Sequence, residues 1–266
     1  MALPITLNIL SPFKTDLVRV GAPRDGGYVV NPKTLRSAES CVTFGLGMDW
    51  SFEKEIHESF GISQITVYDG TVSFLTYLKH VGRIFKGVVN RQEKPRALAY
   101  AVIRQFLGYF VFFRGAVKHE KKMVVVAPRR GNEIGINEVF ECISDPMTMI
   151  TKIDIEGGEY QLIDKLLNSS EFRNSILIVM EWHETFEKRD EFLRFVNAMS
   201  ETHYLIHLVG NSGGGLAADG LPDVLEVTWQ RKDLESLTER VSKLPIDGID
   251  FAHSERRNLF SIEFDI

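Results

Sequence analysis

The stretch Lys152–Glu159, with the sequence KIDIEGGE, constrains the fold more than any other part of the chain. The β-prone run Met149–Thr151 precedes it, and the run Tyr160–Leu167, which is apolar at helical spacing, follows it. This pattern predicts a buried strand that ends in acids and turns through two glycines into a helix. Because ligands of open α/β sheets bind at the carboxyl ends of the strands, we expect three acids to lie where chemistry occurs: Asp154, Glu156 and Glu159.

Glu156 and Glu159 have a second interpretation that the sequence leaves open. Acids favour a helix N-terminus because they interact with the helix dipole, whatever their function. Asp154 is harder to explain in this way, since a carboxylate inside an apolar strand is costly unless it has a partner. Asp154 is therefore the main functional candidate of the stretch.

An apolar run and a pair of glycines predict a ligand-binding turn upstream. Cys41–Phe44 is typical of a strand, Gly45 and Gly47 follow it, and a helix is expected to begin near Ser51. Glycines let the backbone approach a ligand, and a helix N-terminus attracts anionic or polar groups. The third glycine of the full dinucleotide pattern is absent, so the pair alone is a weak signal.

The next predicted strand strengthens this interpretation. Gln64–Tyr68 ends at Asp69, at an offset from the glycines where an acid can accept both ribose hydroxyls of a nucleoside. The alternative is that Asp69 caps the turn formed with Gly70 and Thr71.

The rest of the chain alternates strands and helices. Ser175–His183 predicts another buried strand with a polar end, a helix is expected over 187–201, and a hairpin over 203–230. This alternation predicts a doubly wound α/β sheet, and the late hairpin fits an antiparallel final strand. Other expected elements are β runs at 111–117, 122–127 and 259–264, a loop at 131–135, a helix at 136–143, and a tail helix after Lys232.

These residues together resemble a known family. KIDIEGGE is similar to the Lys-(Ile/Val)-Asp-(Ile/Val)-Glu-Gly-x-Glu signature of FkbM-like methyltransferases, a branch of the S-adenosylmethionine-dependent, class I Rossmann-like enzymes. RDGGY at Arg24–Tyr28, otherwise a simple hairpin signal, resembles a segment of part of this group, which implies that Asp25 and Tyr28 border the pocket. Further matches follow in the expected order: Gly45, Gly47, Asp69, Glu181–His183, Asn211 and Leu221–Glu226.

The resemblance implies a fold and an activity. The fold is the mostly parallel class I methyltransferase sheet in a single domain, 1–266, with 1–40 as an N-terminal approach and 71–114 as a helical cap insertion. The activity is S-adenosylmethionine-dependent O-methylation of a sugar or glycoconjugate hydroxyl. The implied cofactor-binding residues are Phe44, Gly45, Gly47, Asp69 and Asp154.

The expected catalytic residues lie at the ends of two neighbouring strands: Asp154, Glu181 and His183. An unperturbed imidazole has a pKa of about 6.5, so His183 can take the hydroxyl proton near neutral pH while Asp154 orients it or accepts the proton through water. A second mechanism uses the same three residues as ligands of Mg²⁺ or Mn²⁺, which lowers the pKa of the acceptor hydroxyl. The sequence does not decide between the two.

The insertion at 71–114 is the expected acceptor platform. It carries many basic and aromatic residues, suited to phosphate and to sugar faces, and its deletion is expected to spare cofactor binding. Its segment Leu98–Phe113 is strongly apolar but interrupted by Arg104. It is interpreted either as a helix buried under a lid or as a helix on a membrane surface, where a lipid-linked acceptor is found.

Bulk properties exclude several classes of protein. The 266 residues carry a formal net charge of −5, which gives no overall attraction to nucleic acid. Two cysteines, Cys41 and Cys142, imply no disulfide framework, and the N-terminus lacks the pattern of a signal peptide, so a cytoplasmic location is expected.

Two other functions fit the pattern less well. An NAD-dependent oxidoreductase or sugar-nucleotide enzyme on a related fold is disfavoured by the incomplete glycine pattern and by the absence of a plausible Tyr-x-x-x-Lys pair. A non-catalytic nucleotide-binding protein is disfavoured by the retained acids and by His183.

Overall fold

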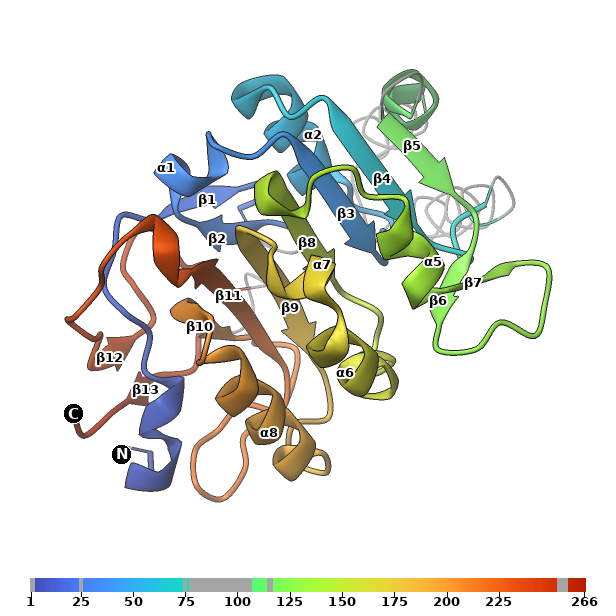
Figure 1. The fold of residues 1–266 in the computed structure, drawn as a ribbon. Coiled ribbons are helices and arrows are strands. Elements are labelled where there is room, and N and C mark those ends of the chain that lie inside the picture. Colours follow the sequence, from blue (N-terminus) through green and yellow to red (C-terminus); the bar gives the residue numbers. More distant parts are fainter. Residues whose placement is uncertain (1–2, 24–25, 74–75, 77–106, 114–116, 253–257) are drawn as a thin grey trace, which may run out of the picture.

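The chain forms one central sheet with helices on both faces (Figure 1). The structure is a computed structural model, and it describes residues 3–23, 26–73, 76, 107–113, 117–252 and 258–266. Most of the predicted insertion 71–114 therefore lies outside the described residues. So does Asp25.

The sheet has seven strands in the order β10-β11-β9-β8-β3-β4-β5. All neighbouring pairs are parallel except those of β11, which runs antiparallel to both β9 and β10. The predicted fold class, a doubly wound sheet of the class I methyltransferase type with a late antiparallel strand, is confirmed. The strands are β3 (Ser40–Phe44), β4 (Gln64–Tyr68), β5 (Val117–Glu120), β8 (Met149–Ile153), β9 (Leu177–Trp182), β10 (His203–Gly210) and β11 (Leu225–Arg231).

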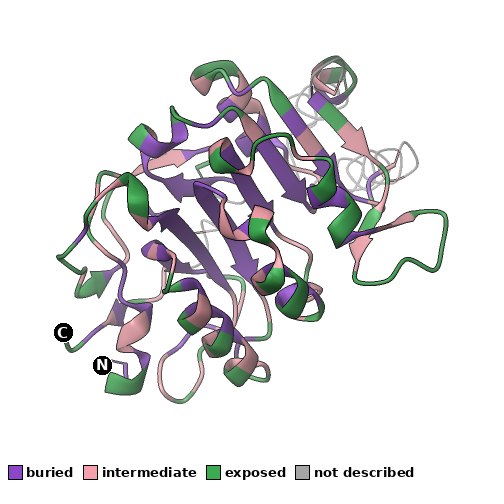
Figure 2. Cartoon of the chain, in the orientation of Figure 1, coloured by how far each residue is buried: buried purple, intermediate pink, exposed green. Residues whose placement is uncertain are grey.

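Two apolar layers cover the sheet. One contains the 3-10 helix η1 and four helices, and the other contains the β1–β2 hairpin, two helices and the helical residues 107–112. Figure 2 shows the central strands β8, β9 and β11 buried along their length and the helices exposed on their outer sides. The first layer comprises η1 (Ile5–Leu10), α5 (Ile136–Glu141), α6 (Glu159–Asn168), α7 (Ser170–Arg173) and α8 (Arg189–Met199). The second has β1 (Val18–Val20), β2 (Tyr28–Val30), α1 (Pro32–Leu35) and α2 (Ser51–Phe60).

The central strand–turn–helix forms as its sequence predicts. Every residue of β8 is buried, as expected for a strand covered on both faces, and α6 begins at Glu159 after the turn through Gly157 and Gly158. The strand ends at Ile153, so Asp154 lies just beyond it rather than inside it. Because of this difference, the Asp154 carboxylate lies at the carboxyl end of the strand, where ligands of such sheets bind.

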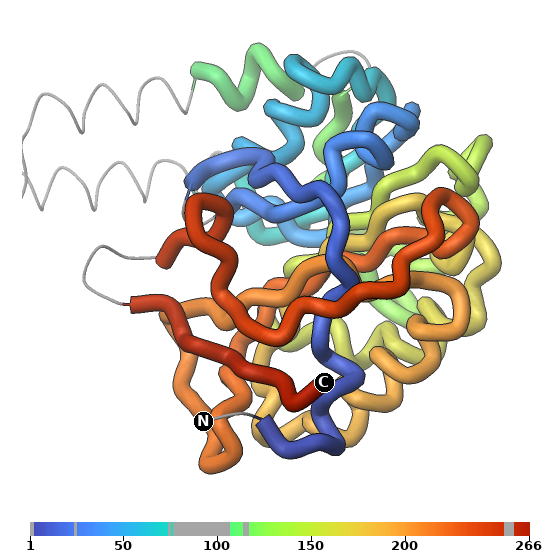
Figure 3. The backbone as a smooth tube through the Cα atoms, turned by 90° about the vertical axis from the view of Figure 1, so that its left-hand side faces the viewer, coloured from blue at the N-terminus to red at the C-terminus, as the bar shows by residue number. Residues whose placement is uncertain are grey.

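The two ends of the chain pack side by side (Figure 3). The Leu3 amide donates to the Glu263 carbonyl, and the Val241 amide donates to the Pro12 carbonyl. The tail contributes a short pair of strands, β12 (Lys243–Leu244) and β13 (Ile262–Glu263), the latter within the predicted run. The helix predicted after Lys232 is only a 3-10 turn, η3 (Lys232–Leu234), in the described part of the tail.

Two predictions around the insertion are wrong in detail. Residues 111 and 112 of the β run predicted at 111–117 belong instead to a helix, in which Phe112 packs against Trp50, while Val117 lies in β5 as predicted. The loop predicted at 131–135 contains the strand β7 (Glu133–Gly135), which pairs with β6 (Met123–Val125).

A second 3-10 helix, η2 (Pro146–Thr148), precedes β8.

No helix in the described part of the chain is long and apolar enough to cross a membrane. The choice between a buried and a membrane-surface helix at Leu98–Phe113 falls mainly on residues outside the described part. The division of the chain into one domain with a cap insertion stays a prediction.

Candidate active site at the carboxyl ends of the strands

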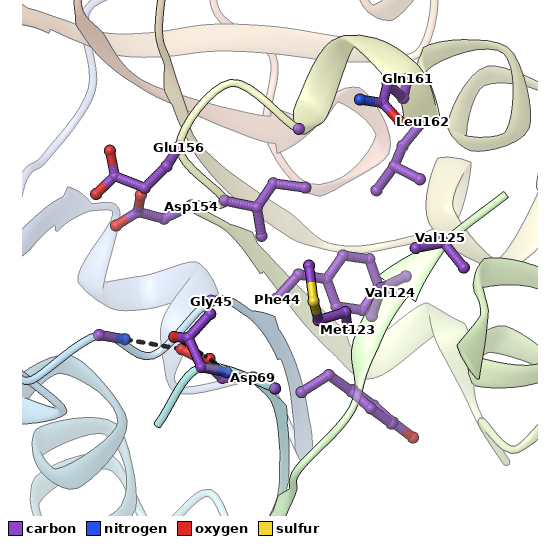
Figure 4. A pocket seen from close by; sticks show the side chains of 16 residues that line it. Phe44, Gly45, Asp69, Met123, Val124, Val125, Asp154, Glu156, Gln161 and Leu162 are labelled. Atoms are coloured by element: carbon purple, nitrogen blue, oxygen red, sulfur yellow. Dashed lines mark hydrogen bonds between the residues drawn. The ribbon is translucent and has the colours of Figure 1, made fainter. Parts of the chain in front are cut away.

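A cavity of about 330 Å³ opens at the carboxyl ends of β3, β4 and β8. Its size lies in the range typical of small-molecule sites. Figure 4 shows its acids, Asp69, Asp154 and Glu156, toward one side, and Leu162 and Val125 toward the other. All five residues predicted to bind the cofactor line this cavity: Phe44, Gly45, Gly47, Asp69 and Asp154.

The glycine turn is shaped by close packing between β3 and β8. Gly45 has a φ of +84°, and a Cβ there would lie 1.6 Å from the Asp154 carbonyl oxygen, so no side chain fits. The Asp154 amide also donates to the Phe44 carbonyl at 2.8 Å. Gly47, with a φ of +58°, has open space beside it. Only Gly45 is therefore required by packing, while Gly47 gives the backbone its turn and leaves room for a ligand.

Asp69 organises the glycine turn. Its Oδ2 accepts from the Leu46 amide at 2.8 Å and from the Gly47 amide at 3.1 Å, while its Oδ1 accepts from the Thr71 amide and hydroxyl and from the Val72 amide. Burial alone raises the pKa of Asp69, but these hydrogen bonds outweigh it and lower the pKa. The turn-capping interpretation is thus seen directly. Ribose binding stays a prediction, and it requires these oxygens to accept further bonds or to exchange existing ones.

Asp154 and His183 lie close together, and Glu156 forms a group of three with them. Each of these three residues offers a ligand atom within 4.8 Å of the others. His183 Nε2 lies 3.4 Å from Glu156 Oε2 and 3.9 Å from Glu181 Oε1. Glu181 therefore belongs to the same cluster, but it lies farther from His183 than Glu156 does.

His183 is oriented by Glu159. Glu159 Oε1 accepts from the His183 amide at 2.8 Å and lies 3.3 Å from Nδ1, and its Oε2 accepts from the Gly157 amide. Burial lowers the pKa of His183, but the hydrogen bond and charge of Glu159, with the charges of Glu181 and Asp154, outweigh it and raise the pKa to about 9. At neutral pH the imidazole is thus cationic, which differs from the unperturbed group that the sequence led us to expect.

Glu181 is held almost fully buried, opposite another acid. Its Oε1 accepts from Asn211 Nδ2 at 2.7 Å, and Glu226 is its direct partner in the β9–β11 register. Burial, followed by the charges of Asp154 and Glu226, raises the pKa of Glu181 to about 8. Burial therefore favours the protonated form of Glu181.

Tyr28 supplies the partner that Asp154 requires. Its hydroxyl donates to Asp154 Oδ2 at 2.9 Å, and burial, followed by the charges of Asp154, Glu181 and Glu226, raises the pKa of Tyr28. The ring of Tyr28 lies 5.0 Å from the Nζ of Lys152, which is itself buried and paired with Glu53 at 3.0 Å. Tyr28 was expected to border the site, and its hydrogen bond to Asp154 is the contact that places it there.

Two strained residues flank the cluster. Glu156 and Glu184 have φ values of +53° and +55°, and they follow the ends of β8 and β9. Non-glycine residues seldom adopt this conformation, and those that do gather at functional sites. The sequence predicts the turn at Gly157 and Gly158, but it leaves Glu156 open to a helix-dipole interpretation and does not indicate its positive φ.

Comparison with known proteins defines the site no further than its geometry does. No protein-family model matches the chain, and no curated protein matches its sequence. The FkbM-like assignment therefore rests on the motif resemblance alone.

Several solved methyltransferase structures resemble the fold distantly. The precorrin-6y C5,15-methyltransferase of Geobacter metallireducens is 15% identical over 75% of this chain and 87% of that chain, with a TM-score of 0.37. TYW2 of M. jannaschii, solved with AdoMet, is 12% identical over 75% and 74%, with a TM-score of 0.33. The M. jannaschii fibrillarin pre-rRNA processing protein is 9% identical over 81% and 82%, with a TM-score of 0.34. Likenesses at this level carry no argument about cofactor or acceptor.

Proposed function

We propose that the protein is an S-adenosylmethionine-dependent O-methyltransferase that acts on a hydroxyl of a sugar or glycoconjugate. One observation carries this proposal above the others. The five residues expected to bind the cofactor line a single cavity, and the acidic side of that cavity meets the proton-handling cluster of Asp154 and His183.

The cavity suits the two chemical halves of the cofactor. The open side of Gly47 and the Asp69 carboxylate offer polar contacts to a ribose and an amino-acid chain, while Val124, Val125 and Leu162 form an apolar wall for an aromatic base. Asp154 then lies near the reacting end, where the positive sulfonium is favoured by a carboxylate.

Methyl transfer needs an aligned and deprotonated acceptor oxygen. S-adenosylmethionine, held by the glycine turn and Asp69, would supply the methyl group to this oxygen, and neutral S-adenosylhomocysteine would be the second product. The hydroxyl proton passes to neutral His183, or to Asp154 through water. Because a bound sulfonium is a like charge for an imidazolium, it lowers the pKa of His183 and increases the fraction able to act as a base.

The same cluster also fits a divalent cation. Asp154, Glu156 and His183 supply carboxylate and imidazole atoms close together, with Glu181 nearby. Glu159 at Nδ1 directs Nε2 of His183 toward them, in the way that carboxylates orient ligating histidines. When bound there, Mg²⁺ or Mn²⁺ would lower the pKa of the acceptor hydroxyl. Loss of activity with EDTA, restored by Mn²⁺ or Mg²⁺, supports this version, and indifference supports His183 as the direct base.

Calorimetric titration tests the class of cofactor first. We expect S-adenosylmethionine and S-adenosylhomocysteine to bind, and NAD and nucleotide sugars not to bind as cofactors. Binding of NAD without S-adenosylhomocysteine would replace this proposal by the oxidoreductase. Cofactor binding without methyl transfer to any glycan acceptor would overturn the proposed acceptor class.

The acceptor platform, peripheral membrane contact and a cytoplasmic location stay parts of the proposal. Only 71–73, 76 and 107–113 of the proposed platform are described. Liposome flotation tests the lipid-linked version, because a surface helix would carry the protein to the vesicle fraction.

A further inference from the structure

The helical residues 107–112 and the following Phe113 contact the glycine turn at Trp50 and reach the Asp69 turn through His119, although none of them lines the cofactor cavity. The contacts are made by an aromatic cluster that we call the clamp: Trp50, Tyr109, Phe112, Phe113 and His119.

On one side the clamp contacts the glycine turn through Trp50, which lies at the end of that turn. Trp50 directly precedes α2, and its ring stacks on Phe112 with centroids 5.0 Å apart and planes 17° apart. A Cβ on Gly108 would lie 3.1 Å from the indole, so a larger residue there would require the ring or the helix to shift by a few tenths of an ångström. The Trp50 Nε1 is buried and has no hydrogen-bond partner among the described residues, so packing rather than hydrogen bonding holds this ring.

On the other side the clamp reaches the backbone of Asp69. His119, on β5, has its Nε2 2.9 Å from the Asp69 carbonyl oxygen and its Nδ1 against the Tyr109 hydroxyl. A carbonyl oxygen can only accept, so Nε2 carries the proton, and in the neutral ring Nδ1 accepts from Tyr109. Burial lowers the pKa of His119, in agreement with a neutral ring.

The two contacts meet inside the cavity wall. Asp69, whose carbonyl is bound by His119, uses its carboxylate to bind the amides of Leu46 and Gly47, in the turn that leads to Trp50. The helix at 107–113, the Asp69 turn and the glycine turn therefore form a closed loop of contacts. Displacement of one member changes the geometry of the other two.

We infer that the clamp is a positioning device that couples docking of residues 107–113 to cofactor binding. This inference rests on the proposed function of the cavity. Its members are positioning residues, since they act through Asp69 and the glycine turn. It also revises the expectation for the insertion: removal of 71–114 takes Tyr109 and Phe112 with it, and we expect cofactor affinity to fall rather than to be spared.

Titration with S-adenosylhomocysteine tests the coupling in the full chain. Tyr109→Phe removes one hydroxyl, and Phe112→Leu removes the stacked ring. We expect affinity to fall about 3- to 10-fold in each, the range of one net hydrogen bond or packing contact. The matched controls are Tyr204→Phe, in the distant strand β10, and Val111→Ala, a residue that is 73% exposed on the same helix. Both are expected to bind as the wild type does.

Hydrogen exchange provides a readout that a merely structural role would not change. In the wild type, S-adenosylhomocysteine should slow amide exchange over 107–113, which the ligand does not cover, and Tyr109→Phe should weaken this protection. Unchanged affinity in both clamp variants, or unchanged exchange over 107–113 on binding, would overturn the coupling alone. No binding of the ligand by the wild type would overturn the proposed function, and with it the coupling.

Discussion

The candidate site has two halves, the cavity turn around Asp69 and the adjoining cluster around His183, and they are built by opposite physical means. In the half around Asp69, backbone amides and the Thr71 hydroxyl donate hydrogen bonds to a single carboxylate. These bonds lower the pKa of Asp69. The half around His183 crowds acids together, so the pKa of His183 rises to about 9 and that of Glu181 to about 8. Fixed dipoles suit the binding of an unchanging cofactor, whereas shifted pKa values suit groups that exchange protons. The comparison predicts that binding and turnover can be separated by mutation.

The largest expected effect is on turnover. Asp154→Ala and His183→Ala should each lower kcat at least about 10²-fold, which is the range for acid–base groups, because the acceptor proton then lacks its destination. Affinity for S-adenosylhomocysteine should remain nearly intact for His183→Ala and change little for Asp154→Ala. The two quantities are measured by a methyl-transfer assay at saturating cofactor and by calorimetry. Near-normal turnover in both variants would exclude this cluster as the reactive centre.

Cofactor affinity is the next largest effect, in the opposite half. Asp69→Ala removes a charged acceptor, and hydrogen bonds to charged groups contribute about 1.5–3 kcal/mol, so affinity should fall roughly 10- to 100-fold. The glycine turn loses its anchor as well, since the Leu46 and Gly47 amides bind this carboxylate. Calorimetry with S-adenosylhomocysteine measures the loss. An unchanged affinity in a folded Asp69→Ala protein would remove Asp69 from the cofactor site.

The pH profile sharpens the contrast further. Neutral His183 increases as pH rises toward about 9, so a direct His183 base predicts that kcat/KM for the free enzyme rises over this range. Glu159→Gln removes the charged partner, and a loss of about 1.5–3 kcal/mol corresponds to a pKa lower by about 1–2 units. NMR titration of the imidazole should show the shift, and the rise in kcat/KM should move to lower pH with it. An imidazole pKa that does not fall in Glu159→Gln would contradict the role of Glu159.

Stability should respond to pH with a definite sign. The pKa of His183 is higher in the folded state than its ordinary value of about 6.5. Its contribution to stability is therefore fully present below about pH 6.5 and is lost as pH rises through about 9. Denaturant unfolding of the wild type and of His183→Ala between these values isolates this contribution, because the variant lacks the titrating group.

The sequence predicts the frame of the cavity better than the reactive cluster. The strand–turn–helix at 149–168, the glycine turn and Asp69 follow from local periodicity, and all of them lie where the pattern indicated. The pairing of His183 with Glu159 and of Tyr28 with Asp154 joins residues that are 24 and 126 positions apart. Only the folded sheet brings such residues together. For the same reason the ordinary pKa of a histidine was a poor guide to His183.

Local ambiguity explains the other differences. The aromatic and β-branched run at 111–113 fits a strand as well as a buried helix, and tertiary contacts with Trp50 decided for the helix. The position of Glu156 depends on a positive φ that a non-glycine residue rarely adopts. Sequence reasoning therefore named Glu181 as the third member of the cluster, although Glu156 lies closer to His183.

The smallest expected effect concerns Tyr28, which joins the reactive half to the N-terminal hairpin. Tyr28→Phe removes the hydroxyl that donates to Asp154 Oδ2 and keeps the ring over Lys152. A single net hydrogen bond contributes about 0.5–1.5 kcal/mol, so kcat should fall roughly 2- to 10-fold. Because Asp69 and the glycine turn are untouched, S-adenosylhomocysteine affinity should stay at the wild-type value, while Tyr204→Phe serves as the control for loss of a remote hydroxyl. A fall in affinity with unchanged kcat would show instead that Tyr28 acts in cofactor binding and not in the reactive cluster around His183.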